Sequence, residues 1–318
     1  MLIGLAITLL VVVAILGGMV AFGTGKAPEP LQALSRPFRN ADFSDLPAPQ
    51  TFPARDGVPL TYRLHAAKAG SPERIVTLIH GGTASSASMH PLAKALAAQG
   101  MTVYSLDIRG HGGSGRRGDL DYPAQLDDDL ADFVAFARKQ YPSTPLVLAG
   151  FSAGGGFSLH IAATPLGTSF ERVVLLAPML GPRAPTIKQI DNVLVKVFVP
   201  RIIAIAILNS IGIHAFDHLQ TLAFGDLNRP ELTPNYSYLL MRGFGTTDYA
   251  SDVRNAKAPL AVVVGAEDDF FQPDRFAPTM DAIRPGIPVT IVPSLAHIPL
   301  ITEPEAVPAI TTAIRRQV

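Results

Sequence analysis

The chain has 318 residues, of which 48% are hydrophobic and 16% are charged, and its 26 basic side chains balance its 26 acidic ones. A chain of this length can bury a large core, and the neutral balance argues against a nucleic-acid-binding protein, which carries a basic excess. Cysteine is absent, which excludes disulfides, thiolate metal sites and a cysteine nucleophile. We therefore expect a globular chain whose function depends on other side chains.

The first 25 residues carry no charged side chain, and residues 2–22 are almost wholly apolar. About twenty helical residues span the roughly 30 Å hydrocarbon core of a bilayer. A cleaved signal peptide would have a basic segment and a shorter apolar stretch, and a buried core helix would show a polar stripe. We predict a single-pass transmembrane anchor over residues 1–25. Because basic residues follow this segment and none precedes it, the positive-inside rule favours a cytoplasmic catalytic domain.

A proline-rich segment, residues 26–50, follows the anchor. Proline fixes φ and removes a backbone donor, so this segment is predicted to be an extended linker. The remaining residues, 51–318, are predicted to form one domain that begins with a β-hairpin turning at Asp56-Gly57.

Short apolar strands and amphipathic helices then alternate along the domain. This pattern is typical of a parallel sheet covered by helices on both faces. The strands are expected at residues 74–79, 102–106, 146–149, 173–176, 260–264 and 289–292. The helices are expected at residues 90–99, 122–140, 153–163, 274–283 and 303–316.

The segment Gly-Phe-Ser-Ala-Gly, residues 150–154, directly follows the predicted strand 146–149 and precedes a predicted helix. A G-x-S-x-G sequence in this context is typical of a nucleophile elbow, a sharp turn that exposes the serine Oγ above the sheet. Its small residues let strand and helix approach, and the helix N-terminus stabilises developing negative charge. We predict that Ser152 is the nucleophile; the alternative is an ordinary glycine-rich loop.

A loop that follows an earlier strand has the composition of an oxyanion hole. Its sequence is His80-Gly81-Gly82-Thr83, and the glycines allow backbone N–H groups to face a cleft. We predict that the N–H of Gly82, or that of Thr83, forms the hole together with the N–H of Ala153. His80 lies within the loop that shapes the hole, so we interpret it as structural rather than as the catalytic base.

Among the eight histidines, His297 alone follows the last predicted strand. In the chain order serine, acid, histidine, the carboxylate comes from an earlier strand end, and the strand 260–264 is followed by Glu267-Asp268-Asp269. We predict His297 as the general base and Asp268 as the acid that orients it, with Asp269 as the main alternative.

Two other patterns are interpreted as structural. Residues 110–115 satisfy G-x-G-x-x-G, but the helix that a dinucleotide site requires does not follow them. Asp127, Asp128, Asp129 and Asp132 fall early in a predicted helix, where acids that face solvent complement the helix dipole. We therefore predict neither a cofactor nor a metal.

Together these segments resemble the α/β-hydrolase superfamily, in particular its serine-aminopeptidase and monoglyceride-lipase-like branch, often labelled Hydrolase_4. The resemblance covers about residues 55–316 and is carried by residues 80–82, 107–114, 150–154 and 265–268 and by His297. It implies a mostly parallel eight-stranded sheet with helices on both faces, the same triad and oxyanion donors, and a helical cap inserted after the sixth strand. The branch usually lacks a long N-terminal apolar span, so the resemblance says nothing about the anchor.

The cap insert is expected at about residues 182–255. It contains two apolar runs, residues 193–199 and 202–208, which Pro200-Arg201 divides. Three interpretations are open: helices that pack on the cap's own core, a wall for an acyl chain, or a lid that dips into the membrane.

These expectations combine into a membrane-tethered serine hydrolase that cleaves carboxylic esters with a lipophilic acyl or alcohol group through an acyl-enzyme. Its expected partners are a small-molecule ester and the membrane, with no nucleic acid and no obligate protein partner. An aminopeptidase or amidase of the same fold is the alternative enzyme. A non-catalytic receptor or scaffold is the alternative outside enzymes, although such proteins usually lose the triad serine or histidine.

Overall fold

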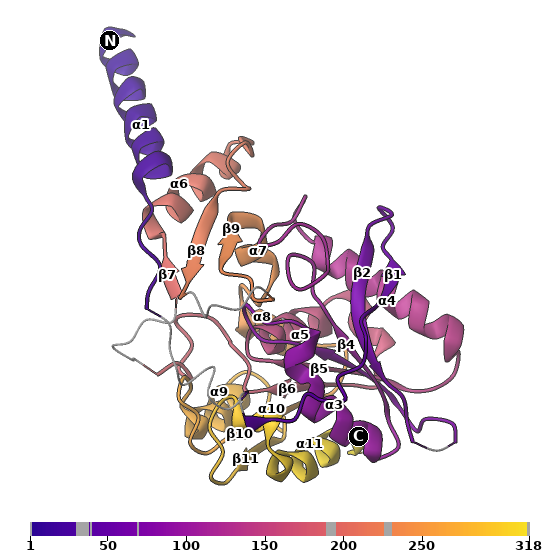
Figure 1. Cartoon of the computed structure of the whole chain (residues 1–318). Helices are drawn as coiled ribbons and strands as arrows, with labels where there is room; N and C mark the ends of the chain where they lie inside the picture. The colour runs from indigo at the N-terminus through magenta and orange to yellow at the C-terminus, as the bar shows by residue number, and fades with distance from the viewer. Residues whose placement is uncertain are drawn as a thin grey trace.

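The computed structural model describes residues 2–29, 38, 40–68, 70–188, 195–225 and 231–316. An eight-stranded sheet lies at the centre of the main domain, and a three-stranded sheet belongs to a smaller lobe, the cap, formed by the described residues between 182 and 255. Figure 1 shows the cap above the main sheet, with the N-terminal helix extending beyond it.

The strands of the main sheet are β1 (Gln50–Pro53), β2 (Pro59–His65), β3 (Ile75–Ile79), β4 (Thr102–Leu106), β5 (Leu146–Phe151), β6 (Arg172–Leu176), β10 (Leu260–Gly265) and β11 (Val289–Val292). Their order in space is β1-β2-β4-β3-β5-β6-β10-β11. The strand β2 pairs antiparallel with β1 and with β4, and the other neighbours pair parallel. The prediction of a mostly parallel, eight-stranded sheet is confirmed.

The helices of the main domain are α3 (His90–Ala98), α4 (Gln125–Gln140), α5 (Ala153–Ala163), α9 (Phe276–Asp281), α10 (Pro299–Thr302) and α11 (Val307–Arg315). The helix α4 was expected from residue 122 but begins three residues later. Ala124 adopts a left-handed conformation with φ of 62°, which a right-handed helix cannot include. Buried residues such as Leu126, Leu130 and Phe133 follow the helical period and turn one face of α4 to the core.

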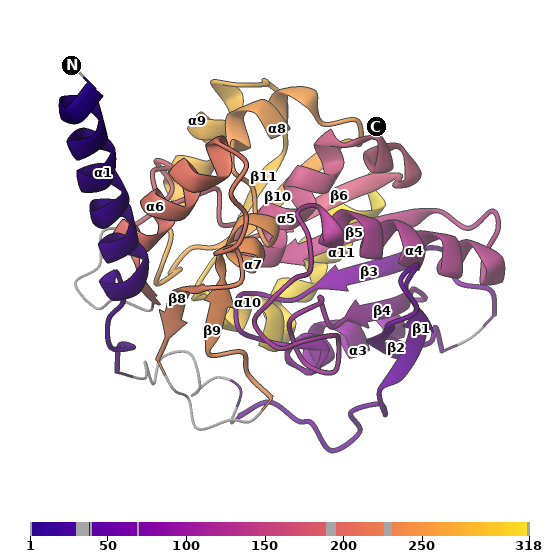
Figure 2. The ribbon, with the colours of Figure 1, turned by 90° about the horizontal axis from the view of Figure 1, so that it is seen from above.

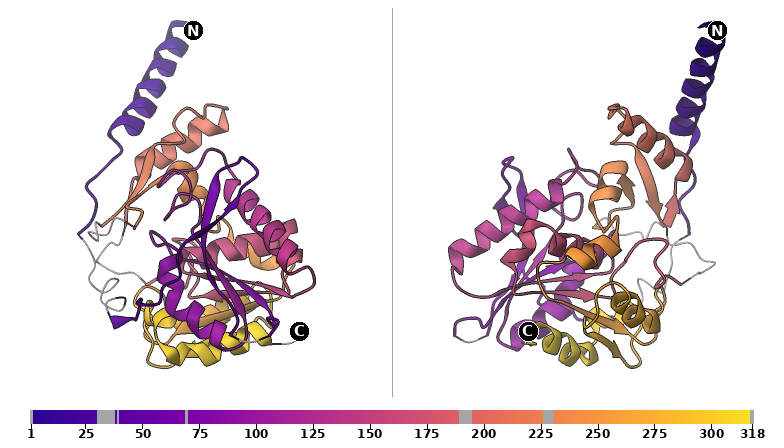
Figure 3. Two further views of the ribbon diagram at one scale, coloured as in Figure 1. Left: turned by 45° about the vertical axis from the view of Figure 1, so that its right-hand side comes forward. Right: turned by 180° about the vertical axis from the view of Figure 1, so that it is seen from behind.

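Five parallel strands, β3, β4, β5, β6 and β10, are buried along their whole length. The helices α3 and α11 pack together on one face of the sheet, and α5 packs on the other (Figures 2 and 3). A strand covered on both faces has no solvent side, so its sequence is a continuous apolar run. For this reason the expected strands agree with the observed ones to within two residues.

The cap contains β7 (Val195–Val197), α6 (Val199–Ser210), β8 (Gln220–Phe224), β9 (Asn235–Ser237), α7 (Tyr238–Gly243) and α8 (Tyr249–Asn255). The prediction of a helical cap is incomplete, because β7, β8 and β9 form an antiparallel sheet. The strand β8 alternates between buried and half-buried residues, which fits a sheet with one covered face. Residues 189–194 and 226–230 of the predicted insert, with the start of its first apolar run, lie outside the described residues.

The N-terminal helix α1 (Leu2–Phe22) leaves most of its apolar side chains exposed. By length and composition it is able to cross a membrane: the mean hydropathy is 2.8 over Ile3–Phe22, and 6% of that stretch is buried. Its C-terminal end packs against α6 of the cap (Figures 1 and 2). Of the predicted linker, residues 30–37 and 39 lie outside the described residues. The linker's Asp45 carboxylate is 2.8 Å from Lys94 Nζ of α3, so this part of it contacts the main domain.

Candidate active site

Ser152 occupies the turn between β5 and α5. Its φ of 55° and ψ of −117° are rare for a residue with a side chain. The Ser152 N–H donates to the carbonyl of Leu176 at 2.9 Å, and the Ser152 carbonyl accepts from the N–H groups of Gly156 and Met179 at 3.1 and 2.9 Å. These three backbone hydrogen bonds fix the strained residue at the carboxyl end of the central strands.

The glycines on either side of the serine allow this close turn. A Cβ atom on Gly154 would lie 2.3 Å from the carbonyl oxygen of His80, and one on Gly150 would lie 2.1 Å from the carbonyl oxygen of Gly154. Cβ atoms do not approach oxygen atoms so closely, so both positions require glycine. The G-x-S-x-G sequence therefore has the steric role expected of an elbow.

Asp268 and His297 follow β10 and β11 and meet above the edge of the sheet. The Nδ1 atom of His297 lies 2.7 Å from the Oδ2 atom of Asp268. The Oδ1 atom of Asp268 accepts from the N–H groups of Phe270 and Phe271, both at 2.9 Å. Both Asp268 and His297 are buried, whereas Asp269 is exposed. The two candidate acids thus differ in position, and Asp268 is the one that contacts the histidine.

The hydrogen bonds of Asp268 assign the protons of the pair. A carboxylate oxygen accepts hydrogen bonds, so the contact with Asp268 Oδ2 is made by a proton on Nδ1 of His297. The other ring nitrogen, Nε2, is then free to accept a proton. The ring lies beside that of Phe151, with centroids 4.5 Å apart, and Phe151 directly precedes Ser152. The structure therefore brings Ser152, Asp268 and His297 to one edge of the sheet.

The loop after β3 lies against the elbow. A Cβ atom on Gly81 would be 3.4 Å from the Cβ atom of Ser152, and one on Gly82 would be 3.8 Å from the Cβ atom of Ala153. The N–H of Thr83 donates to the hydroxyl of Tyr236 at 2.7 Å. Because that N–H is already used, Gly82 is the better of the two predicted oxyanion donors from this loop.

His80 is held by the backbone on both sides of its ring. Its Nδ1 atom lies 2.7 Å from the carbonyl oxygen of Gly81, and its Nε2 atom accepts from the N–H of Ile108 at 3.2 Å. Burial lowers the pKa of His80, so the ring is neutral. A histidine with both nitrogens bonded has no nitrogen left for a serine, in keeping with its structural interpretation.

The glycine-rich loop after β4 closes around Asp107. The carboxylate of Asp107 accepts from the N–H of Ser86 at 2.6 Å and from the N–H of Gly113 at 2.9 Å. A Cβ atom on Gly112, where φ is 50°, would lie 2.1 Å from the same carboxylate. The glycines of this G-x-G-x-x-G segment therefore serve a tight loop that folds around a side chain of the chain itself.

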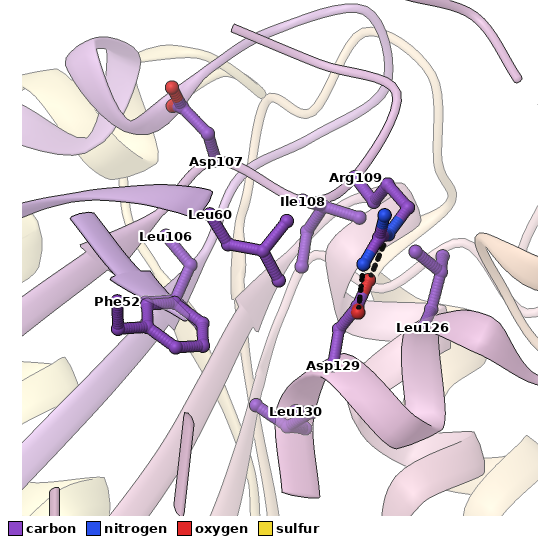
Figure 4. Close-up of a pocket in the computed structure, with 9 residues that line it drawn as sticks. All are labelled: Phe52, Leu60, Leu106, Asp107, Ile108, Arg109, Leu126, Asp129 and Leu130. Carbon is purple, nitrogen blue, oxygen red and sulfur yellow. Dashed lines mark hydrogen bonds and ion pairs between the residues drawn. The ribbon is translucent and has the colours of Figure 1, made fainter. Parts of the chain in front are cut away.

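The four acids of α4 contact basic side chains. Asp129 is buried, contrary to the expectation that it faces solvent, and forms two hydrogen bonds of 2.7 and 2.8 Å with Arg109 beside a small pocket (Figure 4). Asp128 and Asp132 contact Arg55, and Asp127 contacts His160. No group of three or more metal-ligating side chains occurs within the described residues.

Tyr236 of β9 is a further contact of the site, from the cap. Its hydroxyl reaches the oxyanion loop across 153 positions of the sequence. No local motif marks such a contact, because it depends on how the cap docks on the main domain.

Lipases and a methylesterase are among the known proteins with similar sequences. Monoacylglycerol lipase from Mycolicibacterium smegmatis is 31% identical over 129 residues, which cover 39% of this chain and 46% of that protein. Protein phosphatase methylesterase 1 from Bos taurus is 26% identical over 193 residues, which cover 54% of this chain and 50% of that protein. The chain spans about half the length of the curated relatives it matches.

The fold has close counterparts among solved structures. A soluble variant of monoglyceride lipase from Saccharomyces cerevisiae superposes with a TM-score of 0.61 at 17% identity, covering 90% of this chain and 96% of that one. The sequence profile of the Hydrolase_4 family, described as serine aminopeptidase, S33, matches residues 70–305. Because this match takes in more than half of the chain, and the fold agrees with it, the chain belongs to the Hydrolase_4 family of α/β hydrolases.

Proposed function

We propose that this protein is a membrane-tethered serine hydrolase that cleaves carboxylic esters with a lipophilic acyl or alcohol group. The observation that carries the proposal is the 2.7 Å hydrogen bond from His297 to buried Asp268 beside the strained elbow at Ser152. The names of the relatives, a monoacylglycerol lipase and a methylesterase, favour esters over amides.

In the proposed reaction Ser152 Oγ attacks the ester carbonyl while its proton passes to Nε2 of His297. The negative oxygen that forms is stabilised by the N–H groups of Gly82 and Ala153. Collapse of this intermediate breaks the bond to the alcohol, which leaves with the proton from His297. A water molecule then gives a proton to His297 and attacks the acyl carbon. The bond to Ser152 Oγ breaks, the serine takes the proton back from His297, and the acid is released. Asp268 stabilises the imidazolium in both halves of the cycle.

The membrane part of the proposal rests on α1 and α6. Val199, Ile203 and Ile207 are exposed on α6 at a spacing of four, and exposed Ile211 follows them; we call these four residues the α6 ridge. Arg201, the charged residue of α6, faces α1, where its Nε atom donates to the carbonyl of Val20 at 2.8 Å. We propose that the ridge rests in the bilayer interface beside the anchor, so that lipophilic esters reach the site from the membrane.

Labelling with a fluorophosphonate probe tests the nucleophile. We expect the native protein to be labelled at Ser152, and labelling to disappear after heat denaturation and in Ser152→Ala. The same substitution should lower kcat for an ester by up to about 10⁶-fold, since only substrate binding and the oxyanion hole then contribute to catalysis. The unfolding transition should not change. Retention of more than a few per cent of the activity would refute the assignment.

An aminopeptidase is the second candidate, because the family profile bears that description. Turnover of an amino-acid anilide and of a p-nitrophenyl ester by the same preparation separates the two functions. We expect the ester to be cleaved faster by kcat/KM. A higher kcat/KM for the anilide, lost in Ser152→Ala, would replace esterase by aminopeptidase.

Fractionation of expressing cells tests the anchor. We expect the full-length chain to stay in the membrane pellet after alkaline carbonate extraction. Protease treatment of intact membranes should digest a cytoplasmic catalytic domain when it is added from the cytoplasmic side. A soluble product that begins near residue 24 would instead identify α1 as a cleaved signal peptide.

A further inference from the structure

The backbone of Thr83, the residue after the proposed oxyanion donor Gly82, is held from both sides by the cap. Its N–H donates to the hydroxyl of Tyr236 at 2.7 Å, and its carbonyl accepts from the N–H of Thr233 at 2.8 Å. Thr83 has a φ of 64°, a left-handed conformation that is unfavourable for a β-branched residue. Such a conformation persists only where the surroundings enforce it, and here two cap residues supply that constraint.

The Tyr236 hydroxyl is itself held in place by a second side chain. Its oxygen lies 2.6 Å from Nε2 of His111, and both side chains are buried. Burial lowers the pKa of His111 well below its ordinary value, so the ring is neutral and one of its two nitrogens carries a proton. The hydroxyl therefore accepts from the N–H of Thr83 and shares a second hydrogen bond with the His111 ring. The Tyr236 ring also packs edge-on against Phe224 of β8, with centroids 4.9 Å apart.

The contact lies next to the proposed oxyanion hole. A Cβ atom on Gly82 would be 3.7 Å from the Tyr236 hydroxyl and 3.8 Å from the Cβ atom of Ala153, so Gly82 lies between the cap tyrosine and the elbow. Without the hydroxyl, the N–H of Thr83 would lose its partner and the strained peptide would be free to turn. Because that peptide joins Thr83 to Gly82, its rotation would also move the backbone of Gly82.

We propose that Tyr236 is a positioning residue of the oxyanion hole: its hydroxyl holds Thr83, and thereby the N–H of Gly82, in the orientation that accepts the developing oxyanion. The inference rests on the proposed serine-hydrolase function. In this arrangement the oxyanion hole is complete only while segment 233–236 of the cap is docked on the main domain. The position of the cap therefore controls the rate of acyl transfer.

Comparison of Tyr236→Phe with Tyr238→Phe tests the proposal, because both remove one hydroxyl from buried tyrosines of the cap. With p-nitrophenyl butyrate we expect Tyr236→Phe to lower kcat about tenfold and to leave KM within about twofold, since a misplaced donor weakens transition-state binding selectively. The rate of fluorophosphonate labelling should fall by the same factor. Tyr238→Phe should match the wild type in both measurements.

A second pair of variants keeps the test decisive if Tyr236→Phe does not fold. His111→Gln retains a hydrogen-bond partner for the tyrosine hydroxyl and should keep most of the activity, whereas His111→Leu removes the partner and should lower kcat. Equal kcat in Tyr236→Phe and Tyr238→Phe, a change confined to KM, or equal kcat in the two His111 variants would overturn the inference. Ser152→Ala belongs in the same assay: activity in that variant would refute the hydrolase proposal itself.

Discussion

The main sheet and the cap sheet of this protein differ in how they are stabilised. In the main sheet, the parallel strands β5, β6 and β10 are buried from end to end between two layers of helices. In the cap, β7 and β9 have three residues each, β7 is partly exposed, and β8 is covered on alternate residues. The first sheet is a scaffold with a large apolar core, whereas the second depends on its attachment to neighbouring elements.

The candidate site follows this division. Ser152, Asp268 and His297 all belong to strand ends of the main sheet, where backbone hydrogen bonds and burial fix them. The cap reaches the site through polar contacts of Thr233 and Tyr236 with the oxyanion loop. We therefore expect the residues at the strand ends of the main sheet to carry out the reaction, and the contacts of the cap to change its rate. Changes at the strand ends should therefore have the largest effects.

The first test concerns the acid at the end of β10. Asp268→Asn should lower kcat by about 10⁴-fold, because an amide favours the wrong tautomer of His297 and cannot stabilise its cation. Asp269→Asn is the matched control, since the neighbouring carboxylate is exposed, and its kcat should equal that of the wild type. Steady-state kinetics with p-nitrophenyl butyrate measures both. The reverse order of effects would assign the acid to Asp269.

The second test concerns a buried part of the main domain away from the site. His65 Nε2 lies 2.9 Å from His90 Nδ1, and His90 Nε2 lies 3.1 Å from the Asp45 carboxylate. Burial, reinforced by the positive charge that His90 would carry, lowers the pKa of His65 from 6.5 to about 4. Between these values the unfolded chain binds more protons, so stability is full above pH 6.5 and is lost as the pH falls toward 4.

We expect the free energy of unfolding to drop by about 2 to 3 kcal/mol at pH 4.5 through this residue, since one pKa unit corresponds to about 1.4 kcal/mol. Urea unfolding of the detergent-solubilised chain at pH 7 and pH 4.5 measures the change. His65→Asn is less stable at pH 7 but should lose less on acidification. An equal loss in the variant and the wild type would show that other groups carry the pH dependence.

The sequence predicted the main sheet because its strands are continuous apolar runs separated by helices. The cap sheet was not predicted, because three-residue strands such as β7 and β9 are too short to show an alternation of apolar and polar residues. These strands are defined only by their pairing with β8. The start of α4 was also placed too early, because the left-handed conformation of Ala124 is set by the loop around it. Short elements and their ends depend on tertiary contacts.

The residues of the candidate site at the ends of the main-sheet strands were predicted from the sequence, whereas its contact with the cap was not. The order of Ser152, the acid and His297 along the chain, each after a strand, was the basis on which these residues were predicted, and the structure places all three at the carboxyl ends of parallel strands. Asp268 was predicted with Asp269 as the main alternative, and in the structure burial and the contact with His297 distinguish the two adjacent carboxylates. The contact of Tyr236 with Thr83 had no sequence signal, because Thr83 contributes only its backbone N–H, a group that every residue except proline has.

The third test weakens the attachment of the cap to α1. Arg201 is buried and donates to the carbonyls of Val20, Ala21 and Gln220 at 2.8, 3.4 and 2.8 Å. Arg201→Met leaves these carbonyls without their partner, which should destabilise the cap by about 1 to 3 kcal/mol. Hydrogen exchange in detergent should then become faster in α6 and β8 and stay unchanged in β3 and β5. Faster exchange throughout the main sheet would show that the two regions are not independent.

The smallest expected effect concerns the membrane-facing surface. Ile203 of the α6 ridge and Ile291 of β11 are 46% and 43% exposed, so the same substitution removes similar apolar area from the cap and from the main sheet. Transfer of about half an isoleucine side chain out of water is worth about 1 kcal/mol, or about fivefold in binding. Ile203→Asn should therefore lower turnover of a vesicle-embedded ester about fivefold relative to a soluble short-chain ester. Ile291→Asn should leave that ratio unchanged; equal losses in both variants would mean that the cap has no special contact with the bilayer.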